Sequence, residues 1–231
     1  METIIKELLI EFKVLPKYQL ERRIDIFILE KLSSVFTKKL NKPISFIYPE
    51  FPLQSLNINS RNLKMDKNLY SNLIHLEKRA TNHNTNVDYL LASKSTFYFV
   101  ELKTDSNSFK KPSQLLYYAH YIDQPYADLY NFFKDNLAVD NQDPKWKDGL
   151  DYLQRTYKSS FSSDIESNLN NELKLIYLAP SKVEKLKEYQ LFKKQLGEKL
   201  IFMSLKDFGS LIDDDDVLSD LLIEIDKIEI E

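Results

Sequence analysis

Cysteine is absent from the 231-residue chain and glycine occurs only three times, and each scarcity excludes a class of site. Without cysteine the chain has no disulfide, no thiolate zinc site and no cysteine nucleophile. The few glycines form no phosphate-binding loop of the P-loop or dinucleotide type, and GxSxG and HExxH motifs are also missing. Because a cysteine-free chain suits a reducing compartment, we expect a cytoplasmic protein.

A secretory leader and long apolar runs are also lacking. The first twelve residues, METIIKELLIEF, mix apolar residues with lysine and glutamate, which predicts an amphipathic helix rather than a signal peptide. No apolar stretch approaches the length that crosses a bilayer, so no membrane partner is expected. Hydrophobic residues make up 43% and aromatic residues 13% of the chain, which is enough for it to fold alone. We predict a single domain over 1–231, with a core at about 18–205 and a C-terminal helical extension over 206–231.

The net charge of −3 is unevenly distributed along the chain. Residues 1–120 hold 18 Lys and Arg against 12 Asp and Glu, a net charge of +6, whereas residues 121–231 hold 14 against 23, a net charge of −9. The basic half contains the candidate site described below, which is compatible with a phosphate-bearing substrate. Ordinary solvated surfaces would explain the same distribution equally well.

Hydrophobic periodicity predicts an alternation of helices and strands. A long amphipathic helix over 18–37 is followed by three strands, a helix, a strand, a helix and a strand. Pro49 and Pro52 confine the first strand to a sheet edge or terminate it. This order predicts an α/β fold. The predicted strands cover 44–51, 87–92, 96–103, 173–179 and 200–205, and the later helices cover about 113–133, 144–158 and 181–196.

The second and third predicted strands, VDYLLA at 87–92 and TFYFVELK at 96–103, form a hairpin pattern. With a two-residue turn between them, the numbers of paired residues sum to 189, and Asp88 lies opposite Glu101. Opposed strand residues have Cβ atoms about 4.5 to 5.5 Å apart. Because side chains alternate along a strand, Glu101 and Lys103 share a face. The hairpin therefore predicts two carboxylates and one ammonium group at a single spot.

Opposed carboxylates in an apolar hairpin are destabilising unless a positive charge compensates them. A divalent cation would do so, and oxygen ligands without soft partners favour Mg²⁺ or Mn²⁺, which also coordinate phosphate oxygens. Lys103 supplies a charge for a scissile phosphate or helps to activate water. The alternative is structural: Asp88 ends a strand or caps a turn, and Glu101 with Lys103 forms a solvated strand end.

These two strands resemble the second and third core strands of the PD-(D/E)XK nuclease superfamily. In this resemblance Asp88 is the isolated acid, and Glu101, Leu102 and Lys103 form the (D/E)XK element. One difference is that Val87, rather than proline, precedes the first acid. The resemblance implies that Asp88 and Glu101 bind the metal, and that Lys103 positions the attacking water or stabilises the developing charge.

Two further segments extend the resemblance. Gln114 and Tyr118 are similar to the QxxxY helix motif of the RecB-like branch, which implies that they orient the substrate backbone. The first predicted helix stands where the family's first core helix carries an acid, and Glu21 is the best match for a further metal ligand, with Asp25 in reserve. Simple helix pairing and helix-start charges would explain the same residues.

The resemblance implies a restriction-endonuclease-like αβββαβ core, with a central mixed sheet of four to five strands flanked by helices. The implied activity is divalent-metal-dependent hydrolysis of phosphodiester bonds, with DNA favoured over RNA. Fold does not fix function, so a catalytically inactive nuclease-fold binding or regulatory module is the alternative. An unrelated α/β interaction protein also stays open. The expected partner is nucleic acid, and a protein partner or a homo-oligomer stays open.

Overall fold

The computed structural model describes residues 17–53, 85–106, 118, 121–122, 126–138, 144–212 and 217–228. The chain divides into two compact units, each built from segments that are distant in sequence. Unit 1 comprises Met1–Ile44, Glu101–Lys110 and Ile176–Glu231, and unit 2 comprises Ser45–Val100 and Lys111–Leu175. The single domain expected over 1–231 stays a prediction.

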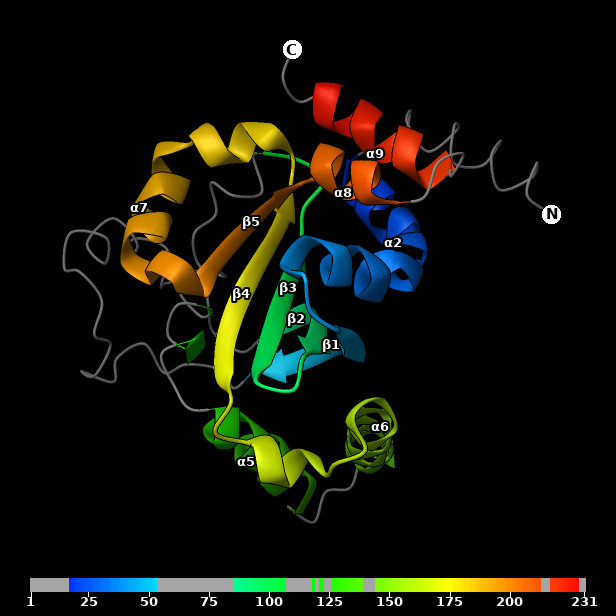
Figure 1. Ribbon diagram of the computed structural model, residues 1–231, viewed down its shortest axis with the longest axis vertical. Coiled ribbons are helices and arrows are strands. Elements are labelled where there is room, and N and C mark those ends of the chain that lie inside the picture. Colours follow the sequence, from blue (N-terminus) through cyan, green and yellow to red (C-terminus); the bar gives the residue numbers. More distant parts are fainter. Residues whose placement is uncertain are drawn as a thin grey trace. The chain divides into compact units, whose positions relative to one another are not determined.

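The strands form a five-stranded sheet in the order β1-β2-β3-β4-β5. The strands β1 to β3 pair antiparallel, whereas the arrows of β4 and β5 point the same way in Figure 1. The sheet is therefore mixed, and the predicted α/β class is confirmed at this level. The five strands are β1 Ser45–Leu53, β2 Thr85–Ala92, β3 Thr96–Leu102, β4 Glu172–Ala179 and β5 Leu200–Ser204.

The hairpin of β2 and β3 has the predicted register. Its described pairs run from Tyr89 opposite Val100 to Ala92 opposite Phe97, and each pair of numbers sums to 189. The Ser93 backbone N–H donates to the Thr96 carbonyl at 2.8 Å and closes the two-residue turn. Among the described strands β1 lies at one edge of the sheet, next to β2, and an edge is one of the two places that its prolines allowed.

Aromatic packing builds the core of unit 2. The Phe97 ring stacks on Tyr126 with centroids 3.8 Å apart, and Phe51 packs against both Phe99 and Tyr126. Such large rings remove much apolar area from water. Helix α6 packs against β1 and α5. The helices of this unit are α5 Tyr126–Ala138, α6 Pro144–Phe161 and the 3₁₀ helix η2 Ile165–Asn168.

Helices also pack on the strands of unit 1. Helix α8 contacts α2, α9 and β5, and α7 contacts β5. At Gly209 in α8 a Cβ atom would lie 2.9 Å from the Ser219 carbonyl oxygen, so this close approach requires glycine. The helices of this unit are α2 Lys17–Leu40, η3 Ser181–Lys185, α7 Lys187–Leu196, η4 Gly197–Lys199, α8 Leu205–Leu211 and α9 Val217–Ile228.

Two of the predicted helices differ from the described ones. The single helix predicted over 181–196 is wrong, because Leu186 has an extended backbone that separates η3 from α7. The helix predicted over 113–133 lies partly outside the described residues, and its described part includes the beginning of α5, which continues to Ala138. None of the helices in the described parts of the chain combines the length and hydrophobicity needed to cross a membrane.

Candidate active site

Glu101 and Lys103 lie side by side at the carboxyl end of β3. The Lys103 Nζ atom is 2.5 Å from Glu101 Oε1, as their shared strand face predicted. All seven residues of β3 are buried, and the exposed fractions are 1% for Glu101 and 8% for Lys103. The pair is therefore a buried ion pair, in which the ammonium group offsets a carboxylate withdrawn from water. The alternative of a solvated strand end does not hold for these two residues.

The backbone of Lys103 is fixed by the neighbouring strand. Its N–H donates to the Leu178 carbonyl in β4 at 2.8 Å. Leu178 has no exposed surface, and Thr104, which follows Lys103, is also buried. This hydrogen bond continues the sheet one residue beyond β3 and holds the lysine in a set position beside Glu101.

Asp88 lies in β2 and is half-buried. It precedes Tyr89, whose β3 partner is Val100, and Glu101 follows Val100. The described pairs end at this position. The expected position of Asp88 opposite Glu101 therefore stays a prediction.

A further acid, Glu50, stands on the other side of Asp88. In the β1–β2 register Pro49 pairs with Tyr89 and Phe51 pairs with Val87, so Glu50 occupies the position across from Asp88. Glu50 is exposed and has a φ of +44°, which is uncommon for a residue other than glycine. A charge on an edge strand explains Glu50 without a role in the site.

The residues of the predicted helix motif are only partly described. Tyr118 is fully buried, and its hydroxyl donates to the Asn86 carbonyl at 3.5 Å, which is long for a hydrogen bond. Asn86 lies two residues before Asp88, so Tyr118 packs against the start of β2. Its predicted contact with substrate stays a prediction. Gln114 lies outside the described residues.

The predicted acids of the first helix belong to α2. The backbone of Glu21 is helical, but its side chain lies outside the described part of the chain. Asp25, one turn later, is half-buried. A ligand role for Glu21 therefore stays a prediction.

The carboxylates of Asp88 and Glu101 suit a hard divalent cation that substrate phosphate oxygens also coordinate. Among the residues that the structure describes, no three acids or histidines gather as a metal cage. Mg²⁺ rarely needs one, because it keeps several waters and binds one or two carboxylates together with phosphate oxygens. Asp88 and Glu101 offer the oxygen ligands that such an ion prefers. Since Lys103 already neutralises Glu101, a cation there would take the place of the ammonium group.

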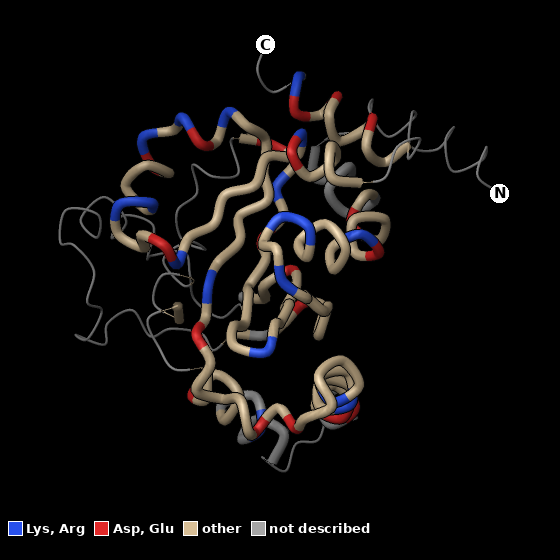
Figure 2. The backbone as a smooth tube through the Cα atoms, viewed as in Figure 1, with Lys and Arg blue, Asp and Glu red and all other residues tan. Residues whose placement is uncertain are grey.

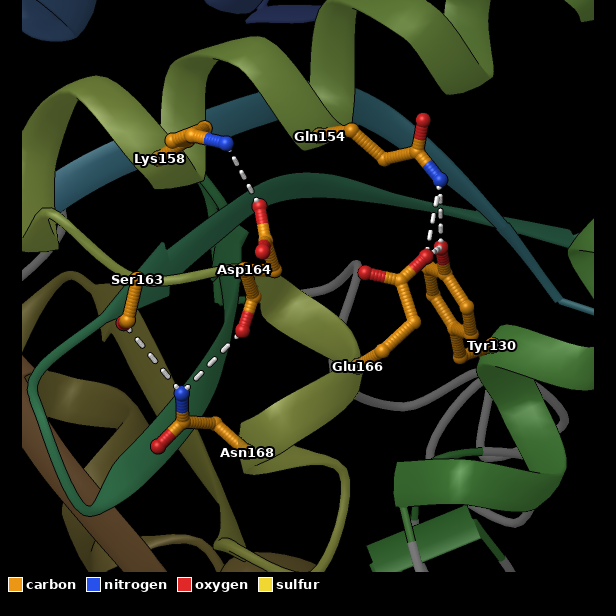
Figure 3. A network of polar contacts seen from close by, with 7 residues as sticks. All are labelled: Tyr130, Gln154, Lys158, Ser163, Asp164, Glu166 and Asn168. Atoms are coloured by element: carbon orange, nitrogen blue, oxygen red, sulfur yellow. Dashed lines mark hydrogen bonds and ion pairs between the residues drawn. The ribbon is translucent and has the colours of Figure 1, made fainter.

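A second polar cluster joins three helices of unit 2 (Figure 3). The Tyr130 hydroxyl of α5 donates to Glu166 Oε1 of η2 at 2.5 Å, and Gln154 of α6 donates to both, at 2.8 and 2.9 Å. Burial, followed by the bond to Glu166, raises the pKa of Tyr130. Burial also raises the pKa of Glu166, but the hydrogen bonds it accepts outweigh this and leave the pKa below its ordinary value. The cluster fastens η2 to the two helices.

Figure 3 also shows an exposed ion pair and two long hydrogen bonds in the same unit. Lys158 pairs with Asp164 at 3.0 Å, and both side chains are largely exposed, so this ion pair contributes little. The Asn168 amide donates to Ser163 Oγ and to the Asp164 carbonyl, both at 3.3 Å. These contacts shape the turn before η2 and offer no catalytic group.

The two polar clusters among the described residues differ in burial and in role. Glu101 and Lys103 form a buried ion pair at a strand end, with Asp88 one residue beyond the described hairpin pairs, whereas Glu166 belongs to a structural joint between helices. Comparisons of the chain with protein-family models, with curated proteins and with solved structures found no match.

Proposed function

We propose that the chain is a divalent-metal-dependent nuclease of the PD-(D/E)XK type that hydrolyses phosphodiester bonds, with DNA favoured over RNA. The observation that carries the proposal is the Glu101–Lys103 pair, an acid and a base two residues apart that meet at the end of a buried strand. The element order supports it, because a helix, three antiparallel strands, further helices, a strand, a helix and a strand agree with a restriction-endonuclease-like αβββαβ core.

In this proposal Asp88 and Glu101 hold Mg²⁺ or Mn²⁺, with Glu21 as a further ligand. When bound, such a cation polarises a phosphate oxygen and lowers the pKa of water. In the proposal Asp88 is contributed by β2 and Glu101 by β3, and the described register of these two strands ends one residue short of both, at Tyr89 and Val100. Rigid strands suit this task better than loops, because small displacements of ligands weaken catalysis.

Lys103 has two states in the proposed mechanism. Without a cation its ammonium group neutralises Glu101 at 2.5 Å. Once the carboxylate charge is compensated otherwise, the flexible four-carbon stem lets the ammonium turn to a non-bridging phosphate oxygen or to the attacking water. The backbone of Lys103 stays bonded to Leu178 throughout, so only the side chain moves.

Tyr118 also supports the site indirectly, through the strand that carries Asp88. A fully buried side chain that reaches the Asn86 carbonyl supports the strand bearing Asp88. In the proposal Gln114, four residues earlier in the sequence, orients the substrate backbone together with Tyr118.

A catalytically inactive nuclease-fold module is the second candidate, and the burial of Glu101 favours it. The charge of a carboxylate with 1% exposure is already compensated by its ammonium neighbour, without a metal. Such a protein would bind nucleic acid with no metal-dependent cleavage, and its Glu101–Lys103 pair would serve the fold alone.

Cleavage assays separate the two candidates. Single- and double-stranded DNA and RNA are incubated with the protein in Mg²⁺, Mn²⁺ or EDTA, and with Lys103→Met and Glu101→Gln variants. The matched control is Lys174→Met, because Glu172 and Lys174 have the same spacing and a 3.3 Å ion pair but lie at the exposed start of β4. Loss of metal-dependent cleavage in the β3 variants only is expected, and equal activity in all four proteins would exclude the proposed site.

A further inference from the structure

The segment that follows β4 is basic within an acidic half of the chain. Residues 181–199, from η3 to η4, contain six lysines and three glutamates, a net charge of +3. The rest of residues 121–231 has a net charge of −12. Lysines recur along the tube through η3 and α7 in Figure 2. We call Lys182, Lys185, Lys187 and Lys194, all exposed, the lysine surface.

Helix geometry arranges these lysines in two pairs, one on each helix. In the 3₁₀ helix η3, Lys182 and Lys185 are three residues apart, so their side chains project from the same face. In α7, Lys187 and Lys194 are seven residues apart, which is close to two turns of an α-helix, so they also share a face. The opposite face of α7 is buried, and it consists of Tyr189, Phe192 and Leu196.

The charges of the lysine surface are not part of ion pairs within the described chain. Within the described part of the chain its four ammonium groups have no ion-pair partner, whereas their neighbour Lys193 pairs with Glu184 at 3.2 Å. Unpaired like charges close together repel one another, so they favour a bound anion.

The lysine surface begins beside the candidate active site. The backbone of Lys103 bonds to Leu178 near the end of β4, and η3 starts three residues later at Ser181. Ser181 is held there by the buried Asp226, which accepts from its N–H at 2.7 Å and from its hydroxyl at 2.5 Å. Figure 1 shows the chain running from the tip of β4 through η3 into α7.

We propose that the lysine surface binds the phosphate backbone of the nucleic acid presented to Glu101 and Lys103, an inference that rests on the proposed function. Charge complementarity is the reason for this partner, since lysines act as point charges for phosphate. Helix α7 alone is about 15 Å long. With one phosphate for about every 3.4 Å of a strand, it spans roughly four phosphates.

The test is the salt dependence of binding in EDTA, where metal-dependent cleavage does not intervene. Fluorescence anisotropy of labelled single- and double-stranded DNA is measured between about 50 and 200 mM salt. The double variant Lys182→Gln/Lys185→Gln should lower the slope of log affinity against log salt by about 1.4 on single strands and 1.8 on duplex. Thermal melts check that each variant is folded.

The matched control removes two lysine charges outside the lysine surface. Lys94 is exposed in the hairpin turn at the far end of β3, and Lys158 forms only an exposed ion pair. The Lys94→Gln/Lys158→Gln variant should keep the wild-type slope.

The outcomes separate the docking surface from the proposed activity. A wild type that cuts DNA, with an unchanged slope for Lys182→Gln/Lys185→Gln, overturns the lysine surface and leaves the nuclease. A protein that cuts nothing but loses slope only in that variant supports the surface and removes the nuclease. Binding to vesicles of phosphatidylserine and phosphatidylcholine without any binding to DNA overturns the inference in favour of a lipid surface.

Discussion

Neutralising one member of the Glu101–Lys103 pair should destabilise the protein far more than neutralising both. The two charged atoms are 2.5 Å apart, and the exposed fractions of the side chains are 1% and 10%. Lys103→Met leaves a buried carboxylate without its ammonium neighbour, and Glu101→Gln leaves a buried ammonium without its carboxylate. The double variant removes both charges at nearly constant volume.

The expected magnitudes follow from burial. Breaking a buried ion pair from one side costs about 3 to 5 kcal/mol, whereas replacing both members by uncharged side chains is close to neutral. In a chain of this length about 1 kcal/mol corresponds to roughly 2 to 4 °C in Tm, so each single variant should melt about 6 to 20 °C lower. The coupling energy between the two substitutions should therefore be several kcal/mol.

Urea unfolding of the four proteins in a double-mutant cycle measures this coupling. The same cycle at Glu172 and Lys174 is the control, since this pair is 48% and 21% exposed and should couple by only about 0.2 to 1 kcal/mol. Equal, small couplings for both pairs would refute the buried charge pair and with it the reason for expecting a cation at Glu101.

Three further predictions concern unfolding. Glu166→Gln should be less stable than wild type above about pH 4.5, because the pKa of Glu166 is lower in the folded protein than in the unfolded chain. The difference in stability should fade as the pH falls further, and thermal melts from pH 7 to 3 measure it. Ser181→Ala should cost about 1 to 3 kcal/mol in urea unfolding, since Asp226 is buried and loses a hydroxyl donor; a cost near zero would mean that the bond is not formed. Gly209→Ala should cost about 1 to 3 kcal/mol, because its Cβ would lie 2.9 Å from a backbone oxygen of α9, and an unchanged Tm would contradict this close packing.

The sequence predicted the hairpin and the shared face of its charged residues because both follow from local rules. A two-residue turn sets the register, and side-chain alternation sets the face, so the pairing of Tyr89 with Val100 and the contact between Glu101 and Lys103 needed no tertiary information. Burial of the ion pair depends on the neighbouring strands, and the pattern of residues did not reveal it.

Other features lay beyond local rules. Helix α8 was not predicted separately, because it has only seven residues and Gly209 interrupts a helical pattern. Tyr130 is 36 residues from Glu166 and 24 from Gln154, so no spacing signal links them. The positive φ of Glu50 likewise has no signature in the sequence.

The most direct test of the proposed function is cleavage of labelled DNA by wild type and by Lys103→Met in parallel, with Mg²⁺, Mn²⁺ or EDTA. We predict cutting by wild type with either metal, none in EDTA, and at least about a hundredfold loss in the variant, as expected when a positioned charge in the transition state is removed. The Lys174→Met control should cut like wild type. Metal-independent cutting, or undiminished cutting by Lys103→Met, would contradict the assignment of Asp88, Glu101 and Lys103 as the catalytic centre.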